Sequence, residues 1–148
     1  MVFTEDLRTE IELEVGADEA WETLTRFEAY PAWNPFIVSV RGEPTVGAKL
    51  TVRLEPPGGR AATLHPRVRE AQPGRVLAWL GRIGFPGVFD AAHRFDLERI
   101  DDGRTRFVQS ERFRGALVPL FRRSLRTHTR AGFEAMNRAL ADRVRTSA

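Results

Sequence analysis

The stretch VFDAAHRFDLERIDDGRTRFVQSERF, residues 88–113, decides the fold. Its two halves alternate apolar and polar residues, a pattern typical of neighbouring β-strands with one buried face. Between the halves, Asp101-Asp102-Gly103 predicts a three-residue hairpin loop with the glycine in the left-handed conformation. The stretch therefore predicts an antiparallel hairpin whose two strands contribute side chains to the same buried surface.

The predicted loop sets which side chains face each other across the hairpin. On the buried face the opposed pairs are Leu97 with Phe107, Phe95 with Gln109, His93 with Glu111, and Ala91 with Phe113. The reverse face opposes Glu98 to Arg106 and Asp90 to Arg114, which are favourable charge pairs. A two-residue loop would set His93 against Arg112 and lose both charge pairs. An imidazole, a carboxylate and an amide are therefore expected on an otherwise aromatic surface, either a core containing polar groups or the floor of a ligand pocket.

Composition limits the function classes. The 148 residues predict a single domain, 1–148, large enough to bury a core. The absence of cysteine excludes disulfides and thiolate chemistry, and three dispersed histidines predict neither a metal site nor a cofactor. The charged start MVFTEDLRTE and the lack of a long apolar run predict a cytoplasmic protein without membrane insertion. A net charge of only +3, without basic runs or RNA-binding aromatic motifs, argues against nucleic acid as a partner.

The remaining elements follow from alternation, helical spacing and turn residues. Residues 9–15 alternate as a strand, and Gly16-Ala17-Asp18 opens a helix with Asp18 as the expected cap. Further strands are expected at Ile37–Arg41, Lys49–Glu55, Thr63–Ala71 and Val76–Ile83, with turns between them. A long helix is expected from Leu117 to Arg145, with Gly132 inside it. A helix-interior glycine costs about 1 kcal/mol relative to alanine, so Gly132 predicts close approach to the sheet or room for a ligand.

Four segments of the chain resemble one family. They are FEAYPAWNPF after the first helix, PGRVLAW in the middle, the HRF-to-SERF hairpin, and TRAGFEAMNRAL in the last helix. Together they resemble the START-like helix-grip superfamily (SRPBCC), especially its polyketide cyclase/dehydrase and lipid-transport-like branch, over essentially the whole chain. The resemblance implies an α+β helix-grip fold, in which a curved antiparallel sheet wraps around a long C-terminal helix and encloses a cavity. Because proteins with this architecture have many different functions, the resemblance indicates the fold more firmly than the activity.

The cavity is expected to bind a hydrophobic or amphipathic small molecule such as a lipid, a polyketide or an aromatic metabolite. The residues expected to contact it are Trp33, Asn34, Phe36, Trp79, Phe85, Phe89, Phe95, Phe107, Gln109, Phe113, Phe121, Leu125, His128 and Met136. For several of them a structural role is an open alternative. Trp33 and Phe36 could pack the elbow around the two prolines, Asn34 could satisfy backbone groups there, and Phe85 could be a flap or simple loop packing.

The His93–Glu111 pair is the candidate for chemistry. It could fix the hairpin register, orient a ligand, or act as an acid/base pair in enolisation, aldol cyclisation or dehydration. The enzyme hypothesis is therefore a cyclase/dehydratase with His93 and Glu111 as catalytic residues. The family's cyclases are thought to use arginine and tyrosine or histidine groups inside the cavity, whereas the sole tyrosine here, Tyr30, lies in the elbow.

A third hypothesis is a protein-interaction module that resembles the chaperone co-activators. A cavity filled by its own side chains would favour it, as would an exposed apolar surface near Phe85 or the C-terminal helix. The sequence leaves open whether the protein is a monomer or a homodimer.

Overall fold

The computed structural model describes residues 1–147 of the chain, with the side chain of the last of these left out. The strands are β1 (Phe3–Leu13), β2 (Ile37–Arg41), β3 (Thr51–Leu54), β4 (Ala62–Leu64), β5 (Arg67–Gln72), β6 (Val76–Ile83), β7 (Phe89–Asp101) and β8 (Arg104–Gly115). The helices are α1 (Ala17–Thr25), η1 (Phe27–Ala29), α2 (Tyr30–Trp33), α3 (Val118–Ser124), η2 (Leu125–Thr129) and α4 (Arg130–Ser147).

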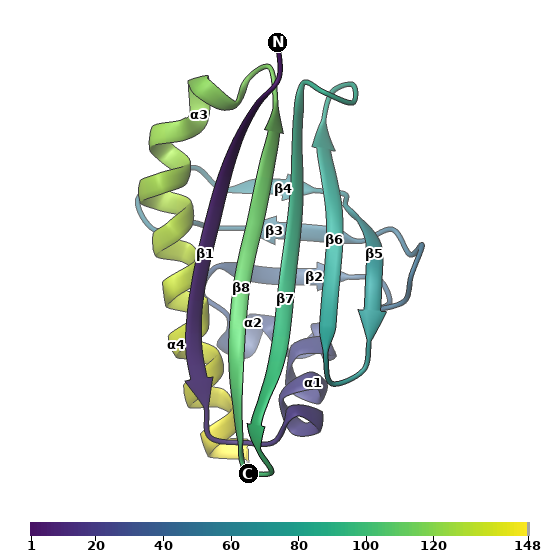
Figure 1. Cartoon of the computed structure of the whole chain (residues 1–148), viewed down its shortest axis with the longest axis vertical. Coiled ribbons are helices and arrows are strands. Elements are labelled where there is room, and N and C mark those ends of the chain that lie inside the picture. Colours follow the sequence, from purple (N-terminus) through teal and green to yellow (C-terminus); the bar gives the residue numbers. More distant parts are fainter. Residues whose placement is uncertain (148) are drawn as a thin grey trace.

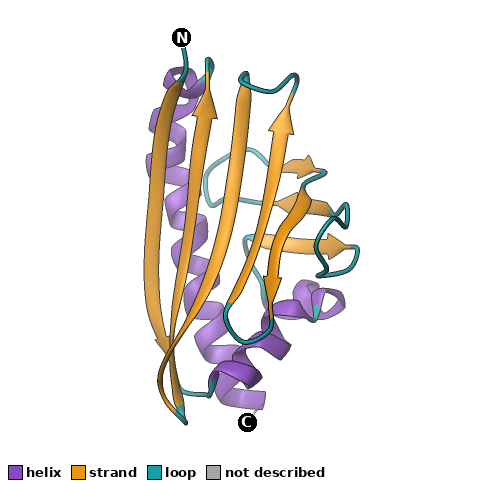
Figure 2. Ribbon diagram, turned by 45° about the vertical axis from the view of Figure 1, so that its right-hand side comes forward, coloured by secondary structure: helices purple, strands orange, loops and turns teal. Residues whose placement is uncertain are grey.

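Two antiparallel sheets and the C-terminal helices form the layers of the fold. The larger sheet has the order β1-β8-β7-β6-β5 and the smaller one β2-β3-β4. Figure 1 shows the small sheet crossing behind the long strands, with α3 and α4 beside it. Figure 2 shows that the long strands curve, so that the large sheet partly encloses the long helix. The predicted α+β architecture, a curved antiparallel sheet with a long C-terminal helix, is confirmed.

The register of the β7–β8 hairpin is the predicted one. His93 pairs with Glu111, and the other opposed pairs also match the prediction. The loop itself differs, because a bulge between Arg99 and Asp101 absorbs the extra residue and leaves a two-residue turn. Gly103 does not adopt a positive φ. Instead its amide donates to the Asp101 carboxylate (2.9 Å), so a side chain stabilises the turn.

The two predicted charge pairs on the outer face have different outcomes. Arg106 contacts Glu98 at 3.3 Å, as expected. Asp90 lies opposite Arg114 in the sheet, but its ion pair is with Arg82 on β6, at 3.4 Å. The neighbouring strand on the other side therefore supplies the closer cation.

Three predicted boundaries were wrong. The expected strand Thr63–Ala71 is interrupted at Pro66, and its two parts belong to different sheets as β4 and β5. The proline has no N–H for the ladder, and this break carries the chain from the small sheet to the large one. At the N-terminus, β1 begins at Phe3 rather than residue 9. The cap of α1 is Gly16, and within the described part of the chain no side chain caps this helix; Asp18 lies in its first turn.

The predicted C-terminal helix is present, with a π-helical turn, η2, in its middle. Gly132 follows this turn in α4 and lies against Phe36. A Cβ atom at Gly132 would lie 2.4 Å from Cδ1 of Phe36, which explains why glycine occupies this helix position. The Phe36 ring also contacts that of Phe133, with 5.7 Å between ring centroids. No helix within residues 1–147 is both long and apolar enough to span a bilayer.

Candidate functional site

A cavity of about 520 Å³ lies between the two sheets and the α3–η2 segment. Its walls come from β3, β4, the β3–β4 loop, β6, β7, β8 and the helical segment. The lining residues are Phe36, Leu54, Pro56, Gly58, Gly59, Arg60, Ala62, Leu64, Ile83, Phe89, Ala91, Glu111, Phe113, Phe121, Ser124, Leu125, His128 and Thr129. In this set, drawn from the described residues, Glu111 is the only carboxylate and Arg60 the only guanidinium.

Glu111 brings a carboxylate to the wall formed by β8. Its Oε1 lies 3.1 Å from Nδ1 of His93, and the two side chains are 10% and 4% exposed. His93 lies behind Glu111 and stacks on Trp79, with ring centroids 5.5 Å apart. The carboxylate is therefore the member of the pair that meets the cavity, and the imidazole supports it from the core.

A chain of buried polar contacts continues behind His93. Its Nε2 lies 2.9 Å from Oε1 of Gln109, whose Nε2 donates to Oδ1 of Asn137 (2.8 Å). Asn137 in turn donates to Oγ1 of Thr9 (2.8 Å), at the partly buried edge of β1. This series of polar contacts therefore links the cavity wall to α4 and to β1 at the edge of the large sheet.

The hydrogen-bond partners of Gln109 determine how its amide group is oriented toward His93. The Gln109 Nε2 also faces the backbone carbonyl of Phe133 (3.4 Å), so a reversed amide would set two oxygen atoms against each other. Gln109 Oε1 is thus the acceptor, and His93 Nε2 carries a hydrogen. Nδ1 of His93 faces Oε1 of Glu111 at 3.1 Å, so the imidazole lies between an amide oxygen and a carboxylate oxygen.

A charge cluster ties the helical wall of the cavity to β1. Glu5 contacts Arg122 of α3 (3.0 Å) and Arg126 of η2 (2.9 Å). Hydrogen bonding to Arg126, followed by the charges of both arginines, lowers the pKa of the Glu5 carboxyl against the opposing effect of desolvation. These contacts hold the α3–η2 segment in place beside the sheet.

Comparison with protein families identifies the relationship. The model for "Polyketide cyclase / dehydrase and lipid transport" matches residues 4–148. The chain belongs to this family. A search of curated protein sequences gave no significant match.

Solved structures of the same fold agree with the family assignment. The Zhui aromatase/cyclase from Streptomyces sp. R1128 superimposes with a TM-score of 0.78 at 18% identity, covering 97% of this chain and 94% of that one. Norcoclaurine synthase from Thalictrum flavum, in complex with dopamine and hydroxybenzaldehyde, gives 0.75 at 13%, covering 99% and 90%. A START superfamily protein from Mycobacterium smegmatis gives 0.74 at 20%, covering 97% and 99%. At these identities the likeness shows the helix-grip fold alone.

Within this family fold, the structure brings some of the predicted contact residues together and separates others. Those that line the cavity are Phe36, Phe89, Phe113, Phe121, Leu125 and His128, together with Glu111. Those that lie buried in the core are Trp79, His93, Phe95, Phe107, Gln109 and Met136. Alternation correctly assigned the face of the sheet, but the inner face is longer than the cavity. The part of this inner face beyond the cavity packs against α4.

Three predicted contact residues lie elsewhere. Asn34 stabilises the elbow, where its Oδ1 accepts hydrogen bonds from the amides of Phe36 (3.0 Å) and Ile37 (2.9 Å). Phe85 is 81% exposed at the tip of the β6–β7 loop. The Trp33 side chain faces a different groove, and its buried Nε1 has no hydrogen-bond partner in the described part of the protein.

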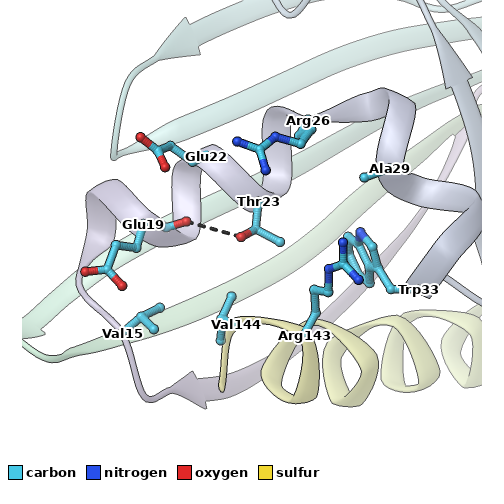
Figure 3. Close-up of a pocket in the computed structure, with 9 residues that line it drawn as sticks. All are labelled: Val15, Glu19, Glu22, Thr23, Arg26, Ala29, Trp33, Arg143 and Val144. Carbon is cyan, nitrogen blue, oxygen red and sulfur yellow. Dashed lines mark hydrogen bonds between the residues drawn. The ribbon is translucent and has the colours of Figure 1, made fainter. Parts of the chain in front are cut away.

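That second groove, of about 400 Å³, lies between α1 and the end of α4. Figure 3 shows Glu19 and Glu22 projecting from α1 and Arg26 from the residue that follows it, with Trp33 beside Arg143 of α4. Its lining is dominated by these charged side chains, in contrast to the largely apolar cavity.

The β3–β4 loop is the part of the cavity wall that sequence reasoning missed. From the sequence, Pro56-Pro57-Gly58-Gly59 predicts only a turn. In the structure His128 Nδ1 donates to the Pro57 carbonyl (3.1 Å), and a Cβ at Gly59 would lie only 3.0 Å from Cβ of His128. The glycines therefore let the loop approach the π-helical turn closely and complete the wall that carries Arg60.

Proposed function

We propose that the cavity binds a hydrophobic or amphipathic small molecule. The observation that carries this proposal is the largely apolar cavity of about 520 Å³, which has one carboxylate in its wall. Apolar surface removed from water contributes roughly 25 cal/mol per Å², so the phenylalanine and leucine side chains would supply most of the affinity. The family, described by cyclisation, dehydration and lipid transport, is consistent with such a ligand.

A cavity-filling variant tests this proposal. Ala91 lines the cavity, whereas its neighbour Ala92 points to the exposed outer face of the same strand. The fluorescent probe anilinonaphthalene sulfonate should bind the wild-type protein and the Ala92→Phe control alike. The Ala91→Phe variant should bind it at least about tenfold more weakly, which corresponds to losing about 1.4 kcal/mol. Equal binding by all three proteins would refute the proposal.

A second candidate function is acid/base catalysis of the cyclase/dehydratase type. The observation that favours it is the pairing of two ionisable groups, because Glu111 lines the cavity and its Oε1 lies 3.1 Å from Nδ1 of the buried His93. In this scheme Glu111 would accept or donate the proton at a carbon next to a carbonyl group. His93 would hold the balancing charge.

Enolisation of a simple ketone tests the catalytic scheme. The wild-type protein should accelerate deuterium exchange at the α-carbon of β-tetralone, followed by nuclear magnetic resonance, and Glu111→Gln should abolish the acceleration. The Ala92→Phe protein is the matched control and should exchange at the wild-type rate. Displacement of the fluorescent probe by β-tetralone without any acceleration would leave ligand binding standing and exclude this catalysis.

The protein-interaction hypothesis receives less support. The cavity is not filled by the protein's own side chains, although Phe85 and Leu120 are exposed near one end of the fold. We therefore favour a ligand inside the cavity over a partner on its rim.

A further inference from the structure

The two charged groups of the cavity belong to different sheets. Glu111 projects from β8 of the large sheet, and Arg60 from the loop that joins β3 and β4 of the small one. Glu111 is nearly buried, with 10% of its side chain exposed, whereas Arg60 is exposed to solvent. A ligand between the sheets therefore meets a carboxylate at its buried end and a cation at its solvent end.

The carboxylate has one oxygen to spare. Oε1 faces His93, and within residues 1–147 no hydrogen bond or ion pair uses Oε2. As a carboxylate oxygen, Oε2 is a hydrogen-bond acceptor. A hydrogen-bond donor on the ligand would satisfy it, and such bonds to charged groups contribute more than neutral ones. An ether or an alkyl group at the same place would leave it unsatisfied.

The guanidinium is likewise unoccupied. Arg60 forms no ion pair or hydrogen bond with any other residue of the described chain, whereas Arg8, Arg94 and Arg112 on the outer surface are paired with carboxylates. Its loop is held against the helical wall by the close contact of Gly58 and Gly59 with His128. A guanidinium at the edge of an apolar cavity suits a carboxylate, which it can bind with two parallel N–H donors.

We infer that the ligand is an amphipathic hydroxy acid, with a hydroxyl group toward Glu111, an apolar body, and a carboxylate toward Arg60. This inference rests on the proposed function of the cavity and specifies its ligand class. The two polar contacts determine which way round the molecule lies, while the apolar walls supply the burial energy. The buried contact contributes more than the exposed one, because water screens the Arg60 contact.

Three ten-carbon probes separate the contributions by isothermal titration calorimetry. ω-Hydroxydecanoate carries both groups, decanoate lacks the hydroxyl, and decanediol lacks the acid. The flexible chain lets the two ends adopt their own separation. We expect ω-hydroxydecanoate to bind about tenfold more tightly than decanoate. It should also bind about threefold more tightly than decanediol.

Variants assign each preference to its residue. Arg60→Gln should remove the preference for the acid and leave that for the hydroxyl, and Arg138→Gln, on the exposed face of α4, is the charge-matched control that should change neither. Glu111→Gln should reduce the hydroxyl preference at least threefold. Equal affinity of the wild-type protein for all three probes would overturn the inference while leaving the proposed function intact. Failure of all three probes and of the fluorescent probe to bind would instead refute the proposed function itself.

Discussion

Gly132→Ala should destabilise the protein even though alanine is the better helix former. The new Cβ would lie 2.4 Å from Cδ1 and 2.6 Å from Cε1 of Phe36. Phe36 is 1% exposed and already contacts Phe133, so its ring has little freedom to move. The side of the ring that remains open faces the cavity, because Phe36 is one of the lining residues.

Two effects of opposite sign determine how much Gly132→Ala changes the free energy of unfolding. Helix propensity favours alanine by about 1 kcal/mol. Overpacking a filled site typically costs 1–3 kcal/mol, and the contact here is shorter than any a folded protein tolerates. We expect a net loss of about 1 kcal/mol in the free energy of unfolding, and a lower affinity for the fluorescent probe as the ring shifts into the cavity.

Urea unfolding of four proteins measures both terms: wild type, Gly132→Ala, Phe36→Leu and the double variant. In the Phe36→Leu background the clash is relieved, so Gly132→Ala should stabilise by up to about 1 kcal/mol. Ala131→Gly, one residue earlier in the same helix, provides the propensity term alone and should destabilise by about the same amount. If Gly132→Ala stabilises the wild-type protein as much as it stabilises Phe36→Leu, then the Phe36 ring does not clash with a side chain at position 132.

Three further variants test other contacts. Asn34→Ala removes the acceptor for two backbone amides of the elbow and should lower the free energy of unfolding by about 2 kcal/mol in urea; an unchanged urea midpoint would show that water replaces the side chain. His93→Leu leaves Glu111 and Gln109 without their partner in the core and should lower the free energy of unfolding by about 3 kcal/mol. A loss below about 1 kcal/mol would contradict the buried polar contacts of His93. Glu5→Gln should destabilise by about 0.5 kcal/mol near neutral pH. Because the pKa of Glu5 is lowered in the folded protein, its contribution to stability is present above the ordinary pKa of 4.5 and disappears as the pH falls through the folded pKa. The free energies of unfolding of the wild type and Glu5→Gln should therefore converge in acid. A difference that persists in acid would contradict the assignment.

The hairpin register could be predicted because several constraints agreed. Alternation indicates the buried face, and only one register opposes Glu98 to Arg106 while keeping His93 opposite Glu111. The turn itself could not be predicted, because a bulge near Ile100 gives the same register as a longer loop. Side-chain pairing therefore determines strand alignment more firmly than it determines backbone conformation at the turn.

The extent of the cavity could not be predicted for a different reason. Periodicity shows which side chains face inward, but not whether a helix or an empty volume lies opposite them. Phe107 and Phe113 share one strand face, yet Phe107 is buried in the core and Phe113 lines the cavity. The difference arises from α4 and from the β3–β4 loop, whose approach depends on Gly59 contacting a histidine about seventy residues away.

Methyl chemical-shift mapping tests whether the apolar cavity is the ligand site, because it locates a bound molecule. The protein would be titrated with anilinonaphthalene sulfonate while carbon–proton spectra of its leucine and valine methyl groups are recorded. If the ligand binds in the cavity, the largest shifts should occur at Leu54, Leu64 and Leu125, which line it between the two sheets and the helix. Shifts concentrated at Val15 and Val144, which line the charged groove of Figure 3, would contradict it.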